Sequence, residues 1–129
     1  MNNQTSRSCI RSYVDSDKLI GLSEDISQQK DLNKITDVLA MFANPTRMKI
    51  LYCLSQTNEL CVCDLSDILQ MEVSAISHQL RKLKDRRLVK NRREGLTIYY
   101  SISSNSLAKK ACEYMEKILS TNFQEFPAP

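Results

Sequence analysis

Two stretches with helical spacing of apolar residues lie so close together that only a short turn can join them. The first ends near Gln70 and the second begins at Val73. Their apolar residues are Val62, Leu65, Ile68 and Leu69 in the first stretch and Val73, Ile76, Leu80 and Leu83 in the second. Two short helices joined this tightly predict a helix-turn-helix, although the turn lacks the glycine often found there.

Beyond Leu88 the spacing of apolar residues changes from helical to alternating. The alternating apolar residues are Leu96, Ile98, Tyr100 and Ile102. Glu94 and Gly95 supply a turn between this strand and residues 88–93. The pattern predicts a β-hairpin with basic residues near its tip.

Further helices flank this unit. One is expected from Asp31 to Phe42, and the next restarts at Asn44–Pro45, where asparagine caps and proline suits the first helical position. A last helix covers residues 105–121. The predicted fold class is mainly α with a β-hairpin, a winged helix-turn-helix with additional N- and C-terminal dimerisation helices.

We expect three segments: a mobile N-terminal arm (1–30), a winged-helix DNA-binding and dimerisation domain (31–121) and a C-terminal tail (122–129). The two outer helices carry apolar stripes that one small core cannot obviously cover. Burial against a second copy predicts a homodimer. Such a dimer would present two reading helices about one turn of DNA apart.

A chain of 129 residues with 42% hydrophobic content supports one core. It has no run of about 18 apolar residues and no apolar signal segment near its start, so no membrane partner is expected. These features predict a cytoplasmic protein. In that reducing compartment, five cysteines indicate free thiols or metal ligands rather than disulfides.

Positive charge is concentrated between Arg81 and Arg93. This segment carries a net charge of +7, which leaves −4 for the rest of a chain whose total is +3. Such a cluster is typical of a phosphate-binding face, and its alternative is an ordinary solvated helix surface. Together with the predicted helix-turn-helix, it predicts double-stranded DNA as the partner.

The second helix of the pair has a polar face opposite its apolar one. With about 3.6 residues per turn, His78 falls opposite the direction set by Ile76 and Leu83. Serine, histidine and glutamine can hydrogen-bond base edges, and arginine and lysine can bind phosphates. The predicted DNA-binding residues are Ser74, Ser77, His78, Gln79, Arg81 and Lys82 on the helix, with Arg92 and Arg93 beside the hairpin turn.

Cys61 and Cys63 stand one residue apart where the first helix of the pair begins. Within a regular helix such residues point in opposite directions, whereas in an extended segment they lie on one side. The pair therefore predicts two thiolate ligands of a soft metal, and its alternative is two small packing residues. Cys53 and Cys112 have no partner at ligand spacing and are expected to pack.

Several segments together resemble the ArsR/SmtB family of metal-sensing winged-helix repressors, with the cadmium- and lead-sensing type closest. They are residues 44–47 (NPTR), 59–65 (ELCVCDL), 73–80 (VSAISHQL), 93–95 (REG) and 99–100 (YY). The resemblance implies a homodimer that represses a metal-resistance operon and leaves DNA when its inducer binds.

The resemblance also bears on the ligand set. Related arsenic sensors carry a third cysteine where this chain has Ser66, whereas cadmium- and lead-sensing members recruit one from an N-terminal arm, which implies Cys9 here. The positions of the zinc-sensing site in the last helix hold Ser104, Ser106, Lys117 and Ser120, none of them a typical ligand. The implied metal ligands are thus Cys9, Cys61 and Cys63, for Cd(II), Pb(II), Zn(II), Cu(I) or As(III).

The sequence therefore predicts a non-enzymatic, metal-responsive repressor that binds operator DNA as an apo-dimer. The alternative on the same scaffold is a repressor that responds to arsenite or to thiol oxidation. A small metal-dependent enzyme is disfavoured, because His78 is the only histidine and lies on the DNA-facing side. A winged helix that binds protein instead of DNA would have the same pattern.

Overall fold

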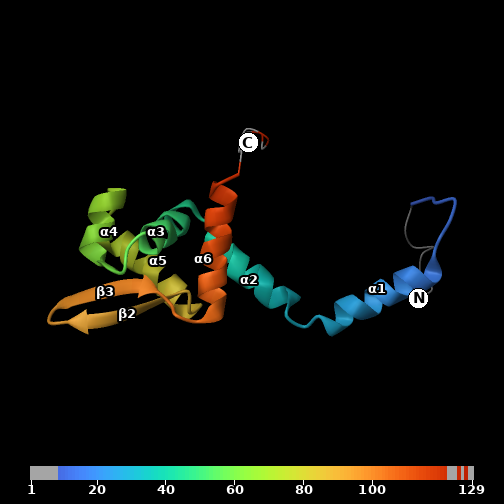
Figure 1. The fold of residues 1–129 in the computed structure, drawn as a ribbon, viewed down its shortest axis with the longest axis horizontal. Coiled ribbons are helices and arrows are strands. Elements are labelled where there is room, and N and C mark those ends of the chain that lie inside the picture. Colours follow the sequence, from blue (N-terminus) through green and yellow to red (C-terminus); the bar gives the residue numbers. More distant parts are fainter. Residues whose placement is uncertain (1–8, 122–124, 126, 128–129) are drawn as a thin grey trace. The chain divides into compact units, whose positions relative to one another are not determined.

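The computed structural model describes residues 9–121, 125 and 127, and most of the predicted elements are confirmed (Figure 1). The chain divides into two compact units, Met1–Asp37 and Val38–Pro129. The elements in order are α1 (Ser16–Gln28), α2 (Leu32–Phe42), α3 (Pro45–Ser55), β1 (Leu60–Cys61), α4 (Val62–Leu69), α5 (Val73–Asp85), β2 (Val89–Glu94), β3 (Thr97–Ile102) and α6 (Ser106–Leu119).

Helix α1 lies within the segment expected to be a mobile arm. Its start is capped by Asp15, whose carboxylate accepts a hydrogen bond from the Lys18 amide at 3.1 Å. None of its 13 residues is buried, although Leu19, Leu22 and Ile26 recur at helical intervals. The arm boundary at residue 30 stays a prediction, and part of the expected tail lies outside the described residues.

Strand β1 is a second element that the sequence did not predict. It is only two residues long, and it pairs antiparallel with β3 through Leu60–Tyr100 and Cys61–Tyr99. Together with the predicted hairpin it forms a three-stranded sheet in the order β1-β3-β2. The segment that carries Cys61 is therefore joined to the hairpin by backbone pairing.

The helix-turn-helix is confirmed as α4 and α5, joined by a turn that needs no glycine. Gln70 takes the left-handed conformation there, with φ 52° and ψ 52°. Ser66 stabilises this turn, because its hydroxyl donates a hydrogen bond to the Met71 carbonyl and its carbonyl accepts one from the Met71 amide. At the hairpin tip the left-handed residue is a glycine, Gly95, with φ +62°.

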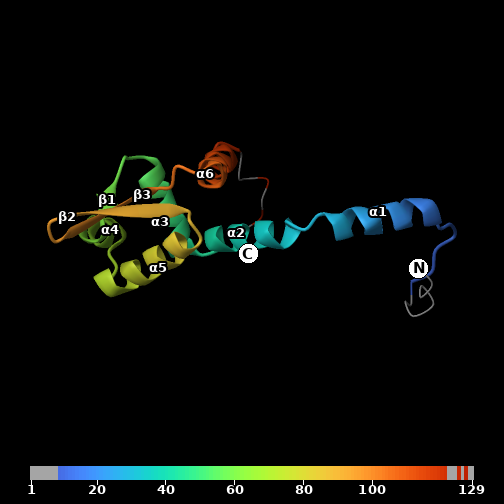
Figure 2. The ribbon, with the colours of Figure 1, turned by 90° about the horizontal axis from the view of Figure 1, so that it is seen from below.

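The core of the second unit lies where α3, α4 and α5 meet the base of the hairpin. Its fully or almost fully buried residues are Ile50, Leu51, Leu54, Leu65, Ile76, Leu80, Leu83, Leu88, Val89 and Ala108. In Figure 2 the strands are seen with α5 and α6 on either side of them, and the hairpin tip extends beyond the helices. This packing leaves one face of α5 and the tip of the hairpin exposed to solvent.

One buried charge connects α2, α3 and α5. Arg47 on α3 is only 9% exposed. Its Nε and Nη2 atoms donate to the Met41 and Ala40 carbonyls at 2.9 and 3.2 Å, and Nη1 donates to Gln79 Oε1 at 2.9 Å. The guanidinium thereby satisfies carbonyls in the last turn of α2, of which Ala40 also accepts the Ala43 amide at 3.2 Å.

We expect Arg47→Met to lower the free energy of unfolding by about 1.5–3 kcal/mol, because acceptors on α2 and α5 lose a charged donor. Urea denaturation followed by circular dichroism measures this change. Lys49→Met on the same helix is the control, and as an exposed substitution it should stay within about 0.5 kcal/mol of wild type. Equal effects of the two substitutions would contradict the role of Arg47.

Candidate metal centre and nucleic-acid interface

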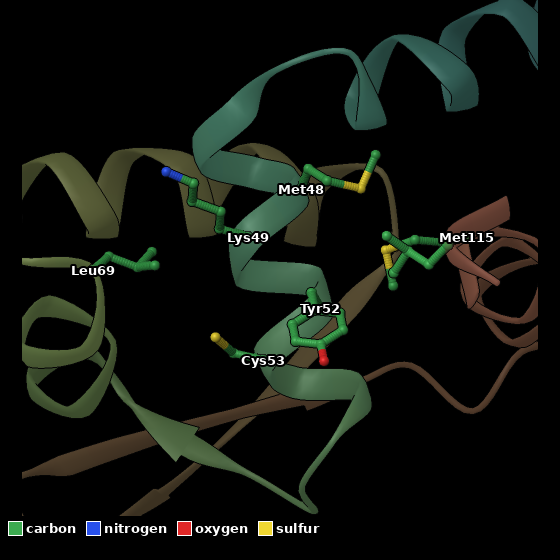
Figure 3. Close-up of a pocket in the computed structure, with 7 residues that line it drawn as sticks. Met48, Lys49, Tyr52, Cys53, Leu69 and Met115 are labelled. Atoms are coloured by element: carbon green, nitrogen blue, oxygen red, sulfur yellow. The ribbon is translucent and has the colours of Figure 1, made fainter. Parts of the chain in front are cut away.

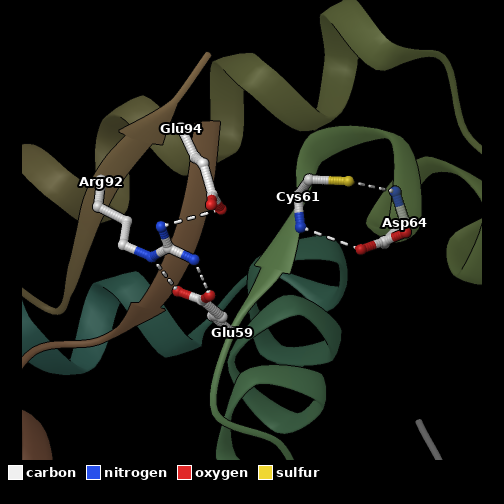
Figure 4. Close-up of polar contacts among 5 residues, drawn as sticks. All are labelled: Glu59, Cys61, Asp64, Arg92 and Glu94. Carbon is white, nitrogen blue, oxygen red and sulfur yellow. Dashed lines mark hydrogen bonds and ion pairs between the residues drawn. The ribbon is translucent and has the colours of Figure 1, made fainter. Parts of the chain in front are cut away.

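Cys61 is the N-cap residue of α4. Its Sγ accepts a hydrogen bond from the Asp64 amide at 3.4 Å, and the Asp64 carboxylate accepts one from the Cys61 amide at 3.1 Å (Figure 4). This reciprocal pair is a capping box in which a thiol takes the place of the usual hydroxyl. The sulfur of Cys61 is thus placed at the point where strand β1 becomes helix α4.

The backbone changes conformation between the two cysteines. Cys61 is extended, with φ −85° and ψ 170°, whereas Cys63 lies in the first turn of α4. Cys61 is half-buried and Cys63 is exposed. The predicted position of the pair at a helix start is confirmed, and both thiols are free. Whether they ligate a metal stays a prediction.

The two thiols alone do not complete a metal site. In the described part of the chain, no group of three or more histidine, cysteine, aspartate or glutamate side chains is arranged to hold a metal ion. Sulfur is nevertheless the donor that soft metals prefer, and two accessible thiols at one helix start fit such an ion. Cys9, the third predicted ligand, is exposed and belongs to the first unit.

The other two cysteines, Cys53 on α3 and Cys112 on α6, are half-buried. Burial raises the pKa of the Cys53 thiol. Burial and the nearby Glu116 carboxylate raise the pKa of the Cys112 thiol. Both shifts disfavour the thiolate, which is the form that binds a metal.

Cys53 contributes to an apolar pocket of about 540 Å³ lined by α3, α4 and α6. The pocket is lined by Met48, Lys49, Tyr52, Cys53, Leu69, Met115 and Leu119. Figure 3 shows the Cys53 sulfur pointing away from Met115 of α6. This arrangement agrees with the expected packing role of Cys53.

The exposed face of α5 carries most of the residues predicted to bind DNA. Ser74, His78, Arg81 and Lys82 are exposed, and Ser77 is half-buried. Gln79 is half-buried and accepts the hydrogen bond from Arg47. The face therefore combines short polar groups near the start of the helix with two cations further along.

At the hairpin, the two predicted arginines have different surroundings. Arg93 Nε donates to the Gly95 carbonyl at 3.2 Å and stays near the tip. The guanidinium of Arg92 instead binds the carboxylates of Glu59 and Glu94 and lies 4.7 Å from the centroid of the Tyr99 ring (Figure 4). Its hydrogen bond lowers the pKa of the Glu59 carboxyl.

Sequence reasoning missed Glu59, although it lies only two residues before Cys61. A single acidic residue ahead of a cysteine pair carries no signal by itself. Its partner is 33 positions away, and only the pairing of β1, β3 and β2 brings the two together.

A winged helix with an exposed polar reading helix and a basic hairpin defines a class of DNA-binding transcriptional regulators. Residues 44–91 match the family described as "Bacterial regulatory protein, arsR family". The chain is 33% identical to the Staphylococcus aureus "Cadmium resistance transcriptional regulatory protein CadC homolog" over 90% of its own length and 98% of that protein's. The chain belongs to the ArsR/SmtB family of transcriptional regulators.

Two further relatives support this assignment. The "Transcriptional repressor SmtB homolog" of Synechocystis sp. is 30% identical over 84% of both chains. The solved structure of HlyU from Vibrio cholerae has a TM-score of 0.66 and 32% identity, covering 73% of this chain and all of that one. The predicted winged-helix fold is thus confirmed. The relatives are regulators and not enzymes, and no described helix is long and apolar enough to cross a membrane.

The cap role of Cys61 separates two substitutions that would otherwise look alike. We expect Cys61→Ala to lower the free energy of unfolding by about 0.5–2 kcal/mol, since the Asp64 amide loses its acceptor. Cys61→Ser should leave stability close to wild type, because a serine hydroxyl caps at least as well. Thermal denaturation of the metal-free proteins measures both, and a stable Cys61→Ala protein would argue against the cap.

Proposed function

We propose that this regulator is a metal-responsive repressor that binds operator DNA as an apo-dimer and releases it when a thiophilic metal binds Cys61 and Cys63. The observation that carries this proposal is the position of Cys61 as the N-cap of α4. Helix α4 is the first helix of the DNA-reading unit and packs against α5 through the core. A metal bound at this cap would act directly on the element that positions α5.

On the DNA side, α5 enters the major groove and the hairpin contacts the adjacent backbone. The residues that contact base edges are Ser74, Ser77, His78 and Gln79. The residues that contact phosphates are Arg81, Lys82 and Arg93. The support is that the exposed groups on this face, Ser74, His78, Arg81 and Lys82, match the donors and acceptors used in groove recognition. Ser77 and Gln79 are half-buried beside them, and Gln79 Oε1 accepts from Arg47. Arg92 is the eighth predicted contact, and its guanidinium is already bound to two carboxylates.

The dimer would form through α2 and α6. On α6, Ala108 and Met115 face the core, while Leu107, Tyr114 and Ile118 are 43–65% exposed. Helix α2 carries exposed Leu32, Ile35 and Leu39 at matching helical intervals. Apolar rows of this kind on two helices support burial against a second copy.

The third thiolate of the metal site would be Cys9, from the same chain or from the second copy. The preference for Cd(II), Pb(II), Zn(II), Cu(I) or As(III) follows from a sulfur donor set. The name of the Staphylococcus aureus relative, a cadmium resistance regulator, supports Cd(II) as the first ion to test. With DNA as its target, the protein would act in the cytoplasm.

We expect Cd(II) to weaken operator binding of the reduced protein by about 5–150-fold, the usual range of an allosteric coupling. Fluorescence anisotropy on the DNA upstream of the gene measures affinity, and the thiolate-to-Cd(II) absorption band measures metal binding. Cys61→Ser and Cys63→Ser should both lose the band and the release, and Cys9→Ser should weaken them.

The matched controls are Cys53→Ser and Cys112→Ser, which should behave as wild type. Metal-induced release that survives in both Cys61→Ser and Cys63→Ser would overturn the proposal. Release by peroxide but by no metal would favour the thiol-oxidation alternative, and release by As(III) alone would favour the arsenite alternative.

The DNA contacts can be sorted by their salt dependence. Lys82→Ala should weaken binding to all sequences alike and reduce the slope of log K against log salt by about 1. His78→Ala should cost about 1–3 kcal/mol on the operator only and leave the slope unchanged. Lys110→Ala removes an exposed lysine of α6 and should change neither quantity. Equal slopes for Lys82→Ala and wild type would contradict the phosphate contact.

A further inference from the structure

The carboxylate that holds Arg92 belongs to the segment that carries the cysteines. Glu59 directly precedes β1, and β1 leads through Cys61 into α4. Arg92 Nε donates to Glu59 Oε2 at 2.8 Å, and Arg92 Nη2 donates to Glu59 Oε1 (Figure 4). The contact therefore joins the cysteine segment to strand β2 of the hairpin.

The strand register also aligns the cysteine segment with strand β2 of the hairpin, through one row of paired residues across the sheet. Cys61 of β1 pairs with Tyr99 of β3, and Tyr99 pairs with Arg92 of β2. The guanidinium also lies over the Tyr99 ring, 4.7 Å from its centroid. A thiol proposed to bind metal and a hairpin arginine are thus connected across the full width of the sheet.

The geometry of the Glu59–Arg92 pair restricts orientation more than a single ion pair would. Two parallel hydrogen bonds between a guanidinium and a carboxylate fix both the distance and the plane of the groups. Backbone pairing between β1 and β3 covers only two residues, so this side-chain contact is a substantial part of the connection. Glu94 also binds Arg92, at 3.2 Å, but it belongs to β2 itself and connects the hairpin to nothing else.

The charges around Arg92 also make it a poor ligand for a phosphate. Its Nε, Nη1 and Nη2 atoms all donate to carboxylates, so the group of three side chains carries a net negative charge. Arg93 has no carboxylate partner among the ion pairs of the described residues and stays close to the tip. Within the hairpin, the two arginines are therefore suited to different roles.

We propose that Arg92 and Glu59 are positioning residues, which transmit the state of the Cys61–Cys63 segment to the hairpin and so couple metal binding to DNA release. This inference rests on the proposed function. A displacement of Cys61 on metal binding would also move Glu59, which lies two residues earlier and directly precedes β1. Because two hydrogen bonds join Glu59 to Arg92, the movement of Glu59 changes the angle of the hairpin relative to α5. The hairpin and α5 then no longer fit one stretch of DNA together.

The test compares three full-length variants with wild type: Glu59→Gln, Arg92→Gln and Glu94→Gln. For each, anisotropy gives operator affinity with and without Cd(II), and the absorption band gives Cd(II) binding. Where wild type loses affinity by about 5–150-fold on Cd(II) binding, Glu59→Gln and Arg92→Gln should keep the band and lose less than about twofold. Glu94→Gln should retain the wild-type ratio.

Two further measurements separate positioning from phosphate binding and from a folding defect. The salt slope of apo Arg92→Gln should equal that of wild type, whereas a phosphate contact would reduce it by about 1. The exchanged pair, Glu59→Arg with Arg92→Glu, should restore a Cd(II)-dependent loss of affinity of at least about fivefold. Such restoration shows that the pair itself is needed, even if a single variant folds poorly.

Three outcomes would overturn the inference. An unchanged Cd(II)-dependent ratio in both Glu59→Gln and Arg92→Gln removes the coupling role while the proposed function stands. A reduced salt slope with an unchanged ratio in Arg92→Gln assigns that residue to DNA instead. If wild type binds Cd(II) at its thiols and keeps its DNA, the proposed function fails and the coupling role fails with it.

Discussion

The guanidinium of Arg47 is the buried charge on which the placement of the reading helix depends. A charge removed from water must be matched by hydrogen bonds, or it destabilises the fold. Arg47 meets this requirement with two carbonyls at the end of α2 and the amide oxygen of Gln79 on α5. No buried side-chain nitrogen or oxygen in the described residues lacks a partner. The angle between α2, α3 and α5 is therefore set by directional contacts as well as by apolar packing.

The helix-turn-helix formed by α4 and α5 is held more weakly at the start of α4. Helix α4 starts at a cysteine N-cap, whose sulfur accepts the hydrogen bond of the Asp64 amide at 3.4 Å. An oxygen acceptor would form this hydrogen bond at a shorter distance. Behind the cap, β1 is two residues long and is supported by the Glu59–Arg92 pair. The unit is thus held by more directional contacts where α5 meets the core than where α4 begins. A ligand that acts on the start of α4 can change the reading unit without unfolding it.

Local signals were sufficient to predict most helices and the hairpin from the sequence. Asn44 and Pro45 marked the start of α3, and alternation after Gly95 marked β3. Strand β1 and the Glu59–Arg92 contact were missed because they exist only through pairing between distant segments. Gln70 was unexpected because a non-glycine residue adopts the left-handed turn there, held by Ser66 and Met71. Helix α1 was missed although Leu19, Leu22 and Ile26 recur there at helical intervals, because this short apolar pattern stands among polar residues and none of the helix is buried.

The proposed coupling through the Glu59–Arg92 contact requires only a small free-energy difference. An exposed ion pair can therefore supply it. Side chains as accessible as Glu59 and Arg92, at 31% and 51%, contribute little to folding stability. Coupling between two sites typically needs only about 1–3 kcal/mol of difference between two conformations. A contact of two parallel hydrogen bonds need not be strong in either state, provided that it is formed in one and strained in the other. The Glu59–Arg92 contact lies beside the cysteine cap. Its modest interaction energy is therefore the one that a small displacement of Cys61 changes most.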